Sequence, residues 1–361
     1  MDVGTVISEH QSMLNTDTFI QIPIAFESPI LRGALYPGED TSNNNFFNLS
    51  IEIPEGFDKL SHKHILIMVN GMGEFLEWTY LDRRRGLCSR FHELGIATCF
   101  MPLPYHFSRM SDVDQRQLKD ERKKRKIALK QSGETAPFSH PTVLRIIEQK
   151  SRFYLGYEQL RWDLGLLTSI INKSKRQGVI PTDTKISLWG FSIGGLGVLG
   201  HFFEKSKLYH SCILAHSGAN FETLGLNRDI LTEDQWIDMK ECWGRIGDCL
   251  KNKNPQGFLQ EMPELHSLNL NEFRKFATIF LGYNKKRLLR LTNRHSDKIL
   301  LFIGGDDDVN SLTSVMGTLI PKAGLAVHTI PGLRHNIHTQ DSFWLRYQIA
   351  ITKVFLDKHP V

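Results

Sequence analysis

Ile186-Ser187-Leu188-Trp189 runs directly into Gly190-Phe191-Ser192-Ile193-Gly194-Gly195. The first four residues are typical of a buried strand, and the residues after Ser192 can form a helix. A Gly-x-Ser-x-Gly turn between the two holds the serine in a strained backbone conformation, because a Cβ at either flanking glycine would clash with the neighbouring elements. The stretch therefore predicts a serine hydroxyl raised above the carboxyl edge of a sheet, where ligands bind in open α/β folds.

Short apolar runs recur on both sides of this stretch and are separated by segments with helical periodicity. Such runs are typical of strands buried on both faces of a parallel sheet. Strands that alternate with helices imply right-handed crossovers, so the sequence predicts an α/β protein with a doubly wound, mostly parallel sheet. The runs are residues 65–69, 97–101, 186–189, 212–215, 299–303 and 325–330, and a helix is expected from about 341 to 356.

Other segments do not follow this alternation. Residues 18–37 predict a strand pair closed by Pro37-Gly38, and residues 42–45 predict a loop. Residues 106–150 form a charged insertion, and residues 218–296 contain amphipathic helical patterns without a convincing strand. We therefore expect a core formed by residues 1–217 and 297–361, with residues 218–296 inserted as a helical lid.

Composition and charge indicate an ordinary globular protein of 361 residues with a formal net charge of +5. Neither a secretory signal nor an apolar run long enough to span a membrane is evident, and the five cysteines match no zinc or disulfide pattern. We expect a cytoplasmic protein. The basic run Arg122–Lys126 is interpreted as a solvated helical face, with peripheral membrane contact as the alternative, and no nucleic-acid partner is expected.

A serine hydroxyl becomes a good nucleophile only when a histidine removes its proton and a carboxylate orients that histidine. Both residue types follow Ser192 in the sequence. Three consecutive aspartates, residues 306–308, come just after the run that ends at residue 303, and His335 follows the run that ends at residue 330. The carboxyl ends of parallel strands meet at one edge, so these groups are expected to come together.

In this order of serine, acid and histidine the chain resembles the α/β-hydrolase family. The resemblance implies Asp307 as the acid, through a Gly-x-x-Asp-x-Val pattern, with Asp306 and Asp308 still possible. A Pro-Gly-x-x-His pattern selects His335 as the base over His338.

The same resemblance implies an oxyanion hole. Asn70-Gly71-Met72-Gly73 is similar to the family's His-Gly-x-Gly loop, with Asn70 in place of the common histidine. By this likeness the backbone N–H groups of Met72 and Ile193 would stabilise the tetrahedral oxyanion. Tyr105 and His106 follow a neighbouring strand and are candidate pocket residues, although a proline-stiffened loop explains them equally well.

These residues predict a serine hydrolase that acts on a small acyl substrate and needs no metal or organic cofactor. A carboxylic ester is the first choice on the family's base rate, before a thioester or an amide. An acyltransferase and a non-catalytic, hydrolase-like binding protein are the alternatives. Residues 195–200 also fit a Gly-x-Gly-x-x-Gly dinucleotide pattern, but no acidic residue ends the next strand, so close helix packing explains these glycines better.

Overall fold

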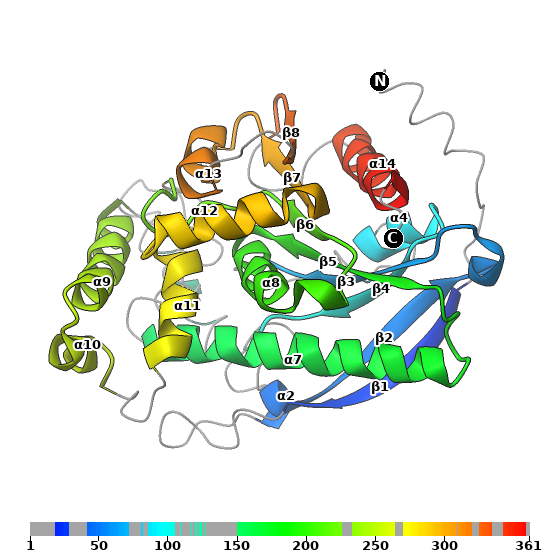
Figure 1. The fold of residues 1–361 in the computed structure, drawn as a ribbon, viewed down its shortest axis with the longest axis horizontal. Helices are drawn as coiled ribbons and strands as arrows, with labels where there is room; N and C mark the ends of the chain where they lie inside the picture. The colour runs from blue at the N-terminus through cyan, green and yellow to red at the C-terminus, as the bar shows by residue number, and fades with distance from the viewer. Residues whose placement is uncertain are drawn as a thin grey trace.

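An eight-stranded sheet runs through the centre of the protein in the order β1-β2-β4-β3-β5-β6-β7-β8 (Figure 1). The computed structural model describes residues 19–28, 42–71, 81, 86–104, 109, 116, 120, 123–124, 127, 150–225, 233–263, 270–307, 309–319, 325–333 and 342–358. Neighbouring strands from β4 to β8 are parallel, which confirms the doubly wound, mostly parallel sheet. These strands are β3 (His64–Val69), β4 (Ala97–Met101), β5 (Lys185–Phe191), β6 (Cys212–Ala215), β7 (Ile299–Gly304) and β8 (Ala326–Ile330).

The antiparallel end of the sheet differs from the sequence prediction. Strand β1 (Phe19–Glu27) pairs along its whole length with β2 (Phe46–Pro54), which in turn pairs antiparallel with β4. Strand β2 was not predicted from the sequence, and the partner of β1 was expected within residues 18–37, of which residues 29–37 lie outside the described residues. The prediction of a loop at residues 42–45 was wrong: they form a short helix, α2 (Ser42–Asn45). Its Asn44 side chain donates a hydrogen bond to Gln159, 2.8 Å away, and this distant contact stabilises the turn.

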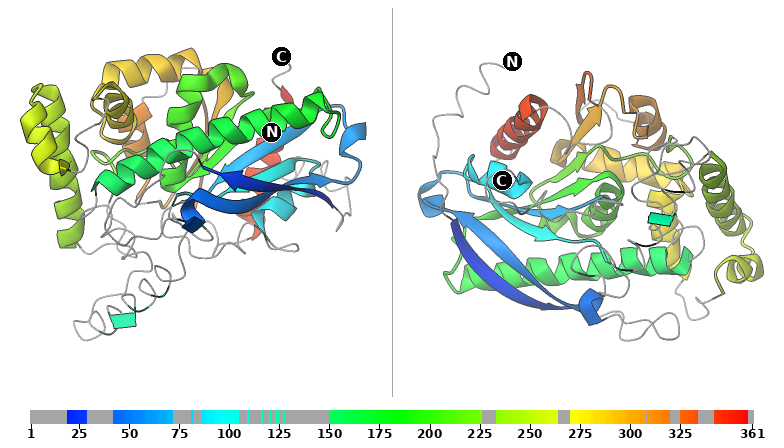
Figure 2. Two further views of the ribbon diagram at one scale, coloured as in Figure 1. Left: turned by 90° about the horizontal axis from the view of Figure 1, so that it is seen from below. Right: turned by 180° about the vertical axis from the view of Figure 1, so that it is seen from behind.

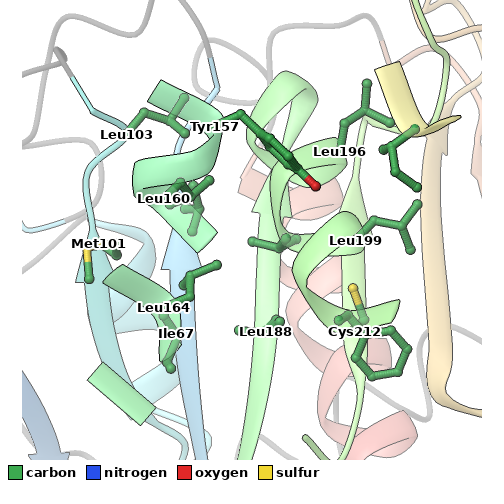
Figure 3. Packing of buried hydrophobic residues seen from close by; sticks show 14 of the residues in the cluster. Ile67, Met101, Leu103, Tyr157, Leu160, Leu164, Leu188, Leu196, Leu199 and Cys212 are labelled. Carbon is green, nitrogen blue, oxygen red and sulfur yellow. The ribbon is translucent and has the colours of Figure 1, made fainter. Parts of the chain in front are cut away.

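Helices cover both faces of the sheet (Figures 1 and 2). The long helix α7 (Lys150–Arg176) and α8 (Ser192–Lys205) pack on one face, and α4 (Leu87–His92) and α14 (Ser342–Lys358) on the other. Leucines of α7 and α8 interlock with apolar side chains of β3, β5 and β6, and this core supports the strand ends (Figure 3). Four shorter elements complete this part of the fold: η1 (Phe57–Lys59), η3 (Ser206–Leu208), η5 (Ser296–Lys298) and α13 (Leu312–Leu319).

The described part of residues 218–296 contains helices joined by turns and irregular segments, and none of its described residues is in a strand. It contains α9 (Glu233–Lys251), α10 (Pro255–Glu261), α11 (Leu270–Phe280) and α12 (Lys285–Arg294). Phe153 of α7 holds α9 and α11 against the core, because its ring lies 5.6 Å from Trp243 and 5.5 Å from Phe280. A half-buried ion-pair cluster centred on Arg161 of α7 adds a polar link to Glu204 of α8 and Glu272 of α11.

The charged insertion is anchored at one buried arginine. The guanidinium of Arg109 and the carboxylate of Asp163 on α7 lie 2.8 Å apart with both side chains fully buried. Arg109 also donates to the carbonyls of Asn44 and Pro102, so it links α2 and the residue after β4 to α7. Burial raises the pKa of Asp163 even beside this cation. Arg109 is therefore built into the core, although it belongs to an insertion that the sequence marks as polar and strongly charged.

Buried histidines should make the stability of the fold depend on pH. Burial lowers the pKa of His201, whose Nε2 lies 2.8 Å from the Tyr209 hydroxyl, to about 3. It likewise lowers the pKa of His92, which contacts Thr98, to about 4. Both groups are therefore neutral in the folded protein at pH values where they are protonated in the unfolded chain.

We expect the free energy of unfolding to fall as pH drops below about 6.5, the unfolded pKa of histidine, towards 4. In this window the unfolded state binds more protons, which costs up to about 1.4 kcal/mol per pH unit for each histidine. Urea unfolding at several pH values should show a shallower pH slope for His201→Gln than for the wild type. His92→Gln should also show a shallower slope than the wild type. Equal slopes for His201→Gln and wild type would contradict the expectation.

Candidate active site

Ser192 lies at the junction where β5 ends and α8 begins. Its φ of 50° is left-handed, a conformation that non-glycine residues seldom adopt and that marks stored backbone strain. The flanking glycines allow the turn: a Cβ on Gly190 would lie 2.6 Å from the Cα of Gly195, and one on Gly194 would collide with the Asn70 carbonyl oxygen. The strained serine predicted from the sequence is therefore present.

The segment after β3 packs directly against this turn. Asn70 is fully buried, its side-chain oxygen accepts a hydrogen bond from the Leu103 N–H at 2.8 Å, and its amide donates to the Gly71 carbonyl at 2.7 Å. A Cβ on Gly71 would lie 3.1 Å from the Cβ of Ser192, so the two backbones are in close approach. Asn70 thus ties the carboxyl ends of β3 and β4 together beside the serine. Ile193 follows Ser192 in the first turn of α8.

Asp307 is placed by the turn that follows β7. Its side chain is buried, whereas that of Asp306 is exposed to solvent. One carboxylate oxygen, Oδ1, accepts hydrogen bonds from the backbone N–H groups of Val309 at 3.0 Å and Asn310 at 2.8 Å. Between the two described aspartates, only Asp307 has the buried, oriented carboxylate that a triad acid needs.

A histidine that the sequence analysis treated as ordinary contacts this acid. His216 directly follows β6, and its Nδ1 lies 3.2 Å from Oδ2 of Asp307. Its Nε2 lies 3.2 Å from the side-chain nitrogen of Gln348 on α14. His216 is fully buried and has a left-handed φ of 48°. Its position just past a buried strand, the same signal that selected the aspartates, could have identified it.

The strand ends bring these groups to one edge of the sheet. Ser192 and Asn70 follow the adjacent strands β5 and β3, and His216 and Asp307 follow the adjacent strands β6 and β7. The other sequence-predicted site residues lie outside the described residues; they are Met72, Tyr105, His106, Asp308, His335 and His338. Within the described ranges, no three histidine, cysteine or acidic side chains are grouped so that they could hold a metal ion.

The glycines of α8 that fit a dinucleotide pattern serve helix packing. A Cβ on Gly197 would lie 2.7 Å from Leu160, and one on Gly200 would collide with Tyr157, both on α7. The two helices therefore approach closely along this face. These glycines were expected to let the helix pack closely on the sheet; at positions 197 and 200 the close neighbour is α7 instead.

No protein-family model matches the chain, and no curated protein matches it in sequence. Solved structures resemble it at low identity. A putative dipeptidyl aminopeptidase IV from Bacteroides ovatus is 10% identical, with 96% of this chain and 36% of that chain covered and a TM-score of 0.50. This chain thus spans about a third of the Bacteroides protein.

Two further solved structures are similar over nearly the whole chain. A lipase in its open form is 14% identical, with 94% of this chain and 99% of that chain covered and a TM-score of 0.48. A protein from Xanthomonas campestris, described as a member of the α/β serine hydrolases without a lid, is 10% identical, with 94% and 96% covered and a TM-score of 0.45. None of the helices in the described ranges is long and apolar enough to cross a membrane.

Proposed function

Because the chain has the α/β-hydrolase fold, we propose that it is a serine hydrolase that cleaves a carboxylic ester. Ser192 is the nucleophile, His335 the general base and Asp307 the acid that orients the base. The observation that carries this proposal is the left-handed Ser192 between β5 and α8, packed against Gly71. If position 192 served only the fold, a glycine would be more stable there, because glycine adopts a positive φ without strain.

The reaction would proceed through an acyl-enzyme. The Ser192 oxygen attacks the ester carbonyl while His335 accepts the hydroxyl proton, and the same histidine then returns that proton to the leaving alcohol. Water next attacks the acyl-enzyme, with His335 again accepting a proton, and the acid product leaves as Ser192 is regenerated. Asp307 stays ionised throughout and stabilises the imidazolium form of the base.

The negative charge on the carbonyl oxygen requires hydrogen-bond donors that are in place before the reaction. The backbone N–H groups of Ile193 and Met72 are the proposed donors. The contacts of Asn70 support this assignment, since they hold Gly71, the residue before Met72, next to Ser192. Asn70 here takes the place of the histidine that the family commonly has. The helices α9 to α12 would act as a lid, with Tyr105 and His106 lining the acyl pocket.

The cellular setting is also proposed from the sequence. A cytoplasmic location agrees with the five cysteines, all of which are free thiols. Peripheral membrane contact would use the basic run Arg122–Lys126, of which Lys123 and Lys124 are exposed. The proposed reaction depends neither on the location of the protein nor on membrane contact.

Labelling with a fluorophosphonate probe tests the proposed function, since the probe reacts with serines activated by a neighbouring base. We expect the wild type to be labelled and to hydrolyse short-chain nitrophenyl esters, while Ser192→Ala and His335→Ala remain unlabelled. Ser187→Ala is a matched control, because Ser187 is a buried serine of the same strand that bonds Ser211; it should label as the wild type does. A folded wild type that neither labels nor hydrolyses esters would exclude the proposal and favour a binding protein.

A further inference from the structure

We propose that His216 is a positioning residue for the reaction, which orients the Asp307 carboxylate and is itself held by Gln348 of α14. This inference rests on the proposed hydrolase function. Asp307 would then have two histidine partners: His335, the base implied by the family pattern, and His216. The contacts that carry it are the two 3.2 Å distances from the ring nitrogens of His216 to Asp307 and Gln348.

The hydrogen-bond pattern identifies the form of the imidazole. When the amide nitrogen of Gln348 donates, Nε2 of His216 accepts, and the ring proton is on Nδ1. Nδ1 then donates that proton to Oδ2 of Asp307. This neutral tautomer satisfies both contacts at once, so the Gln348 donor favours the form in which Nδ1, the nitrogen that faces the acid, carries the proton.

His216 completes a two-sided grip on the carboxylate. Oδ1 of Asp307 is held by the backbone of the following turn, at Val309 and Asn310, and Oδ2 is held by His216 from the neighbouring strand end. Rotation of the carboxylate would break bonds on both oxygens. A general base is efficient only when the carboxylate that orients it is held in one geometry. Hydrogen bonds on both oxygens of Asp307 would therefore support the proposed triad.

The backbone at His216 points to the same role. A left-handed φ of 48° is costly for a residue with a Cβ, and Gly218, two residues later, also has a positive φ of 117°. Strain of this kind persists only where surrounding contacts hold it, and it is concentrated at functional sites. His216 and Ser192 are two of the three described non-glycine residues with positive φ, and both follow central strands at the same edge.

His216 lies in direct contact with a charged group, because its Nδ1 is 3.2 Å from Oδ2 of Asp307. Gln348 contacts it from α14, and the ring of Phe191 from β5 has its centroid 5.7 Å from the imidazole. A change in the charge of His216 would therefore act on Asp307 first. Through Asp307 it would change how strongly the base holds a proton.

Three variants separate orientation from simple packing. His216→Ala removes the donor, whereas His216→Asn keeps an amide donor near Nδ1 and suits a left-handed backbone. Gln348→Glu places a carboxylate against Nε2, which draws a second proton onto the ring and puts an imidazolium beside Asp307. His201→Ala is the matched control, since His201 is an equally buried histidine that bonds Tyr209.

We expect His216→Ala to lower kcat/KM about tenfold and His216→Asn to recover most of that loss. In a plot of kcat/KM against pH, the acidic limb should move to higher pH in His216→Ala. The Asp307 carboxylate then has one hydrogen-bond donor fewer and stabilises the protonated base more strongly, which raises the pKa of the base. It should move to lower pH in Gln348→Glu, where the imidazolium offsets the carboxylate charge. His201→Ala should lower the unfolding temperature and leave the profile in place.

These opposite shifts are the decisive readout, since a merely structural role for His216 would not produce them. An active wild type whose acidic limb is the same in His216→Ala and Gln348→Glu would overturn the inference and leave the hydrolase proposal intact. A wild type without labelling or turnover would instead remove the proposed function, and the inference with it. Fluorophosphonate labelling of the wild type distinguishes these two failures.

Discussion

Replacing Ser192 with alanine is expected to abolish ester hydrolysis, with a loss in kcat of at least about 10⁴-fold. The variant lacks the oxygen that forms the acyl-enzyme, and any remaining rate would come from the oxyanion donors and substrate binding alone. The fold should be unaffected, because alanine and serine both carry a Cβ and bear a similar cost at a φ of 50°. Initial rates with a chromogenic ester, together with the unfolding temperature of each protein, check both parts of this expectation.

Ser187→Ala provides the comparison for this result. Ser187 is fully buried on β5, and its hydroxyl lies 2.9 Å from that of Ser211. Its replacement should cost some stability and leave kcat near the wild-type value. If Ser192→Ala retained full activity in the same assay, the acyl-enzyme mechanism would be wrong.

Replacement of Asp307 by asparagine should have the second largest effect, a loss in kcat of about 10³- to 10⁴-fold. The amide cannot stabilise an imidazolium, and its NH₂ group favours the wrong tautomer of the base. The structure adds a local reason: with Oδ1 still accepting from Val309 and Asn310, the new NH₂ group would face the Nδ1–H of His216. Two donors would then oppose each other in a buried site, so kcat and the unfolding temperature should both fall.

Asp306→Asn is the natural control, since Asp306 precedes the acid by one residue and its side chain is exposed. Its kcat/KM should stay within about twofold of the wild type, because exposed side chains contribute little to the site. The two variants are compared through kcat/KM and a pH profile. Greater sensitivity at position 306 than at position 307 would mean that the assignment of the acid is wrong.

Local patterns were sufficient for the central part of this fold. Continuous apolar runs predicted the parallel strands β3 to β7, because a strand buried on both faces needs apolar residues throughout. The run that predicted β8 forms an edge strand that is mostly only half-buried. The Gly-x-Ser-x-Gly turn predicted the strained Ser192, since only glycines fit where Gly190 and Gly194 meet their neighbours. In both cases the pattern that carries the prediction lies within a few residues of the sequence.

Other features depend on partners that are distant in the sequence. Strand β2 alternates between buried and exposed residues over only part of its length, and its pairing with β1 and β4 became visible only in the fold. The buried ion pair of Arg109 and Asp163 joins residues 54 positions apart in the sequence. Burial of this arginine was not expected, because it lies in a charged insertion. No local periodicity encodes such contacts.

The sequence by itself determined the α/β class, the positions of the central strands and the serine turn, because burial and backbone sterics act locally. The resemblance to the α/β-hydrolase family favoured Asp307 and left Asp306 and Asp308 possible; in the structure Asp307 is buried and Asp306 is exposed. Only the tertiary structure revealed His216. Its importance arises from Asp307, 91 residues later, and Gln348, 132 residues later, and a hydrogen bond across such distances exists only once the strands and α14 have packed.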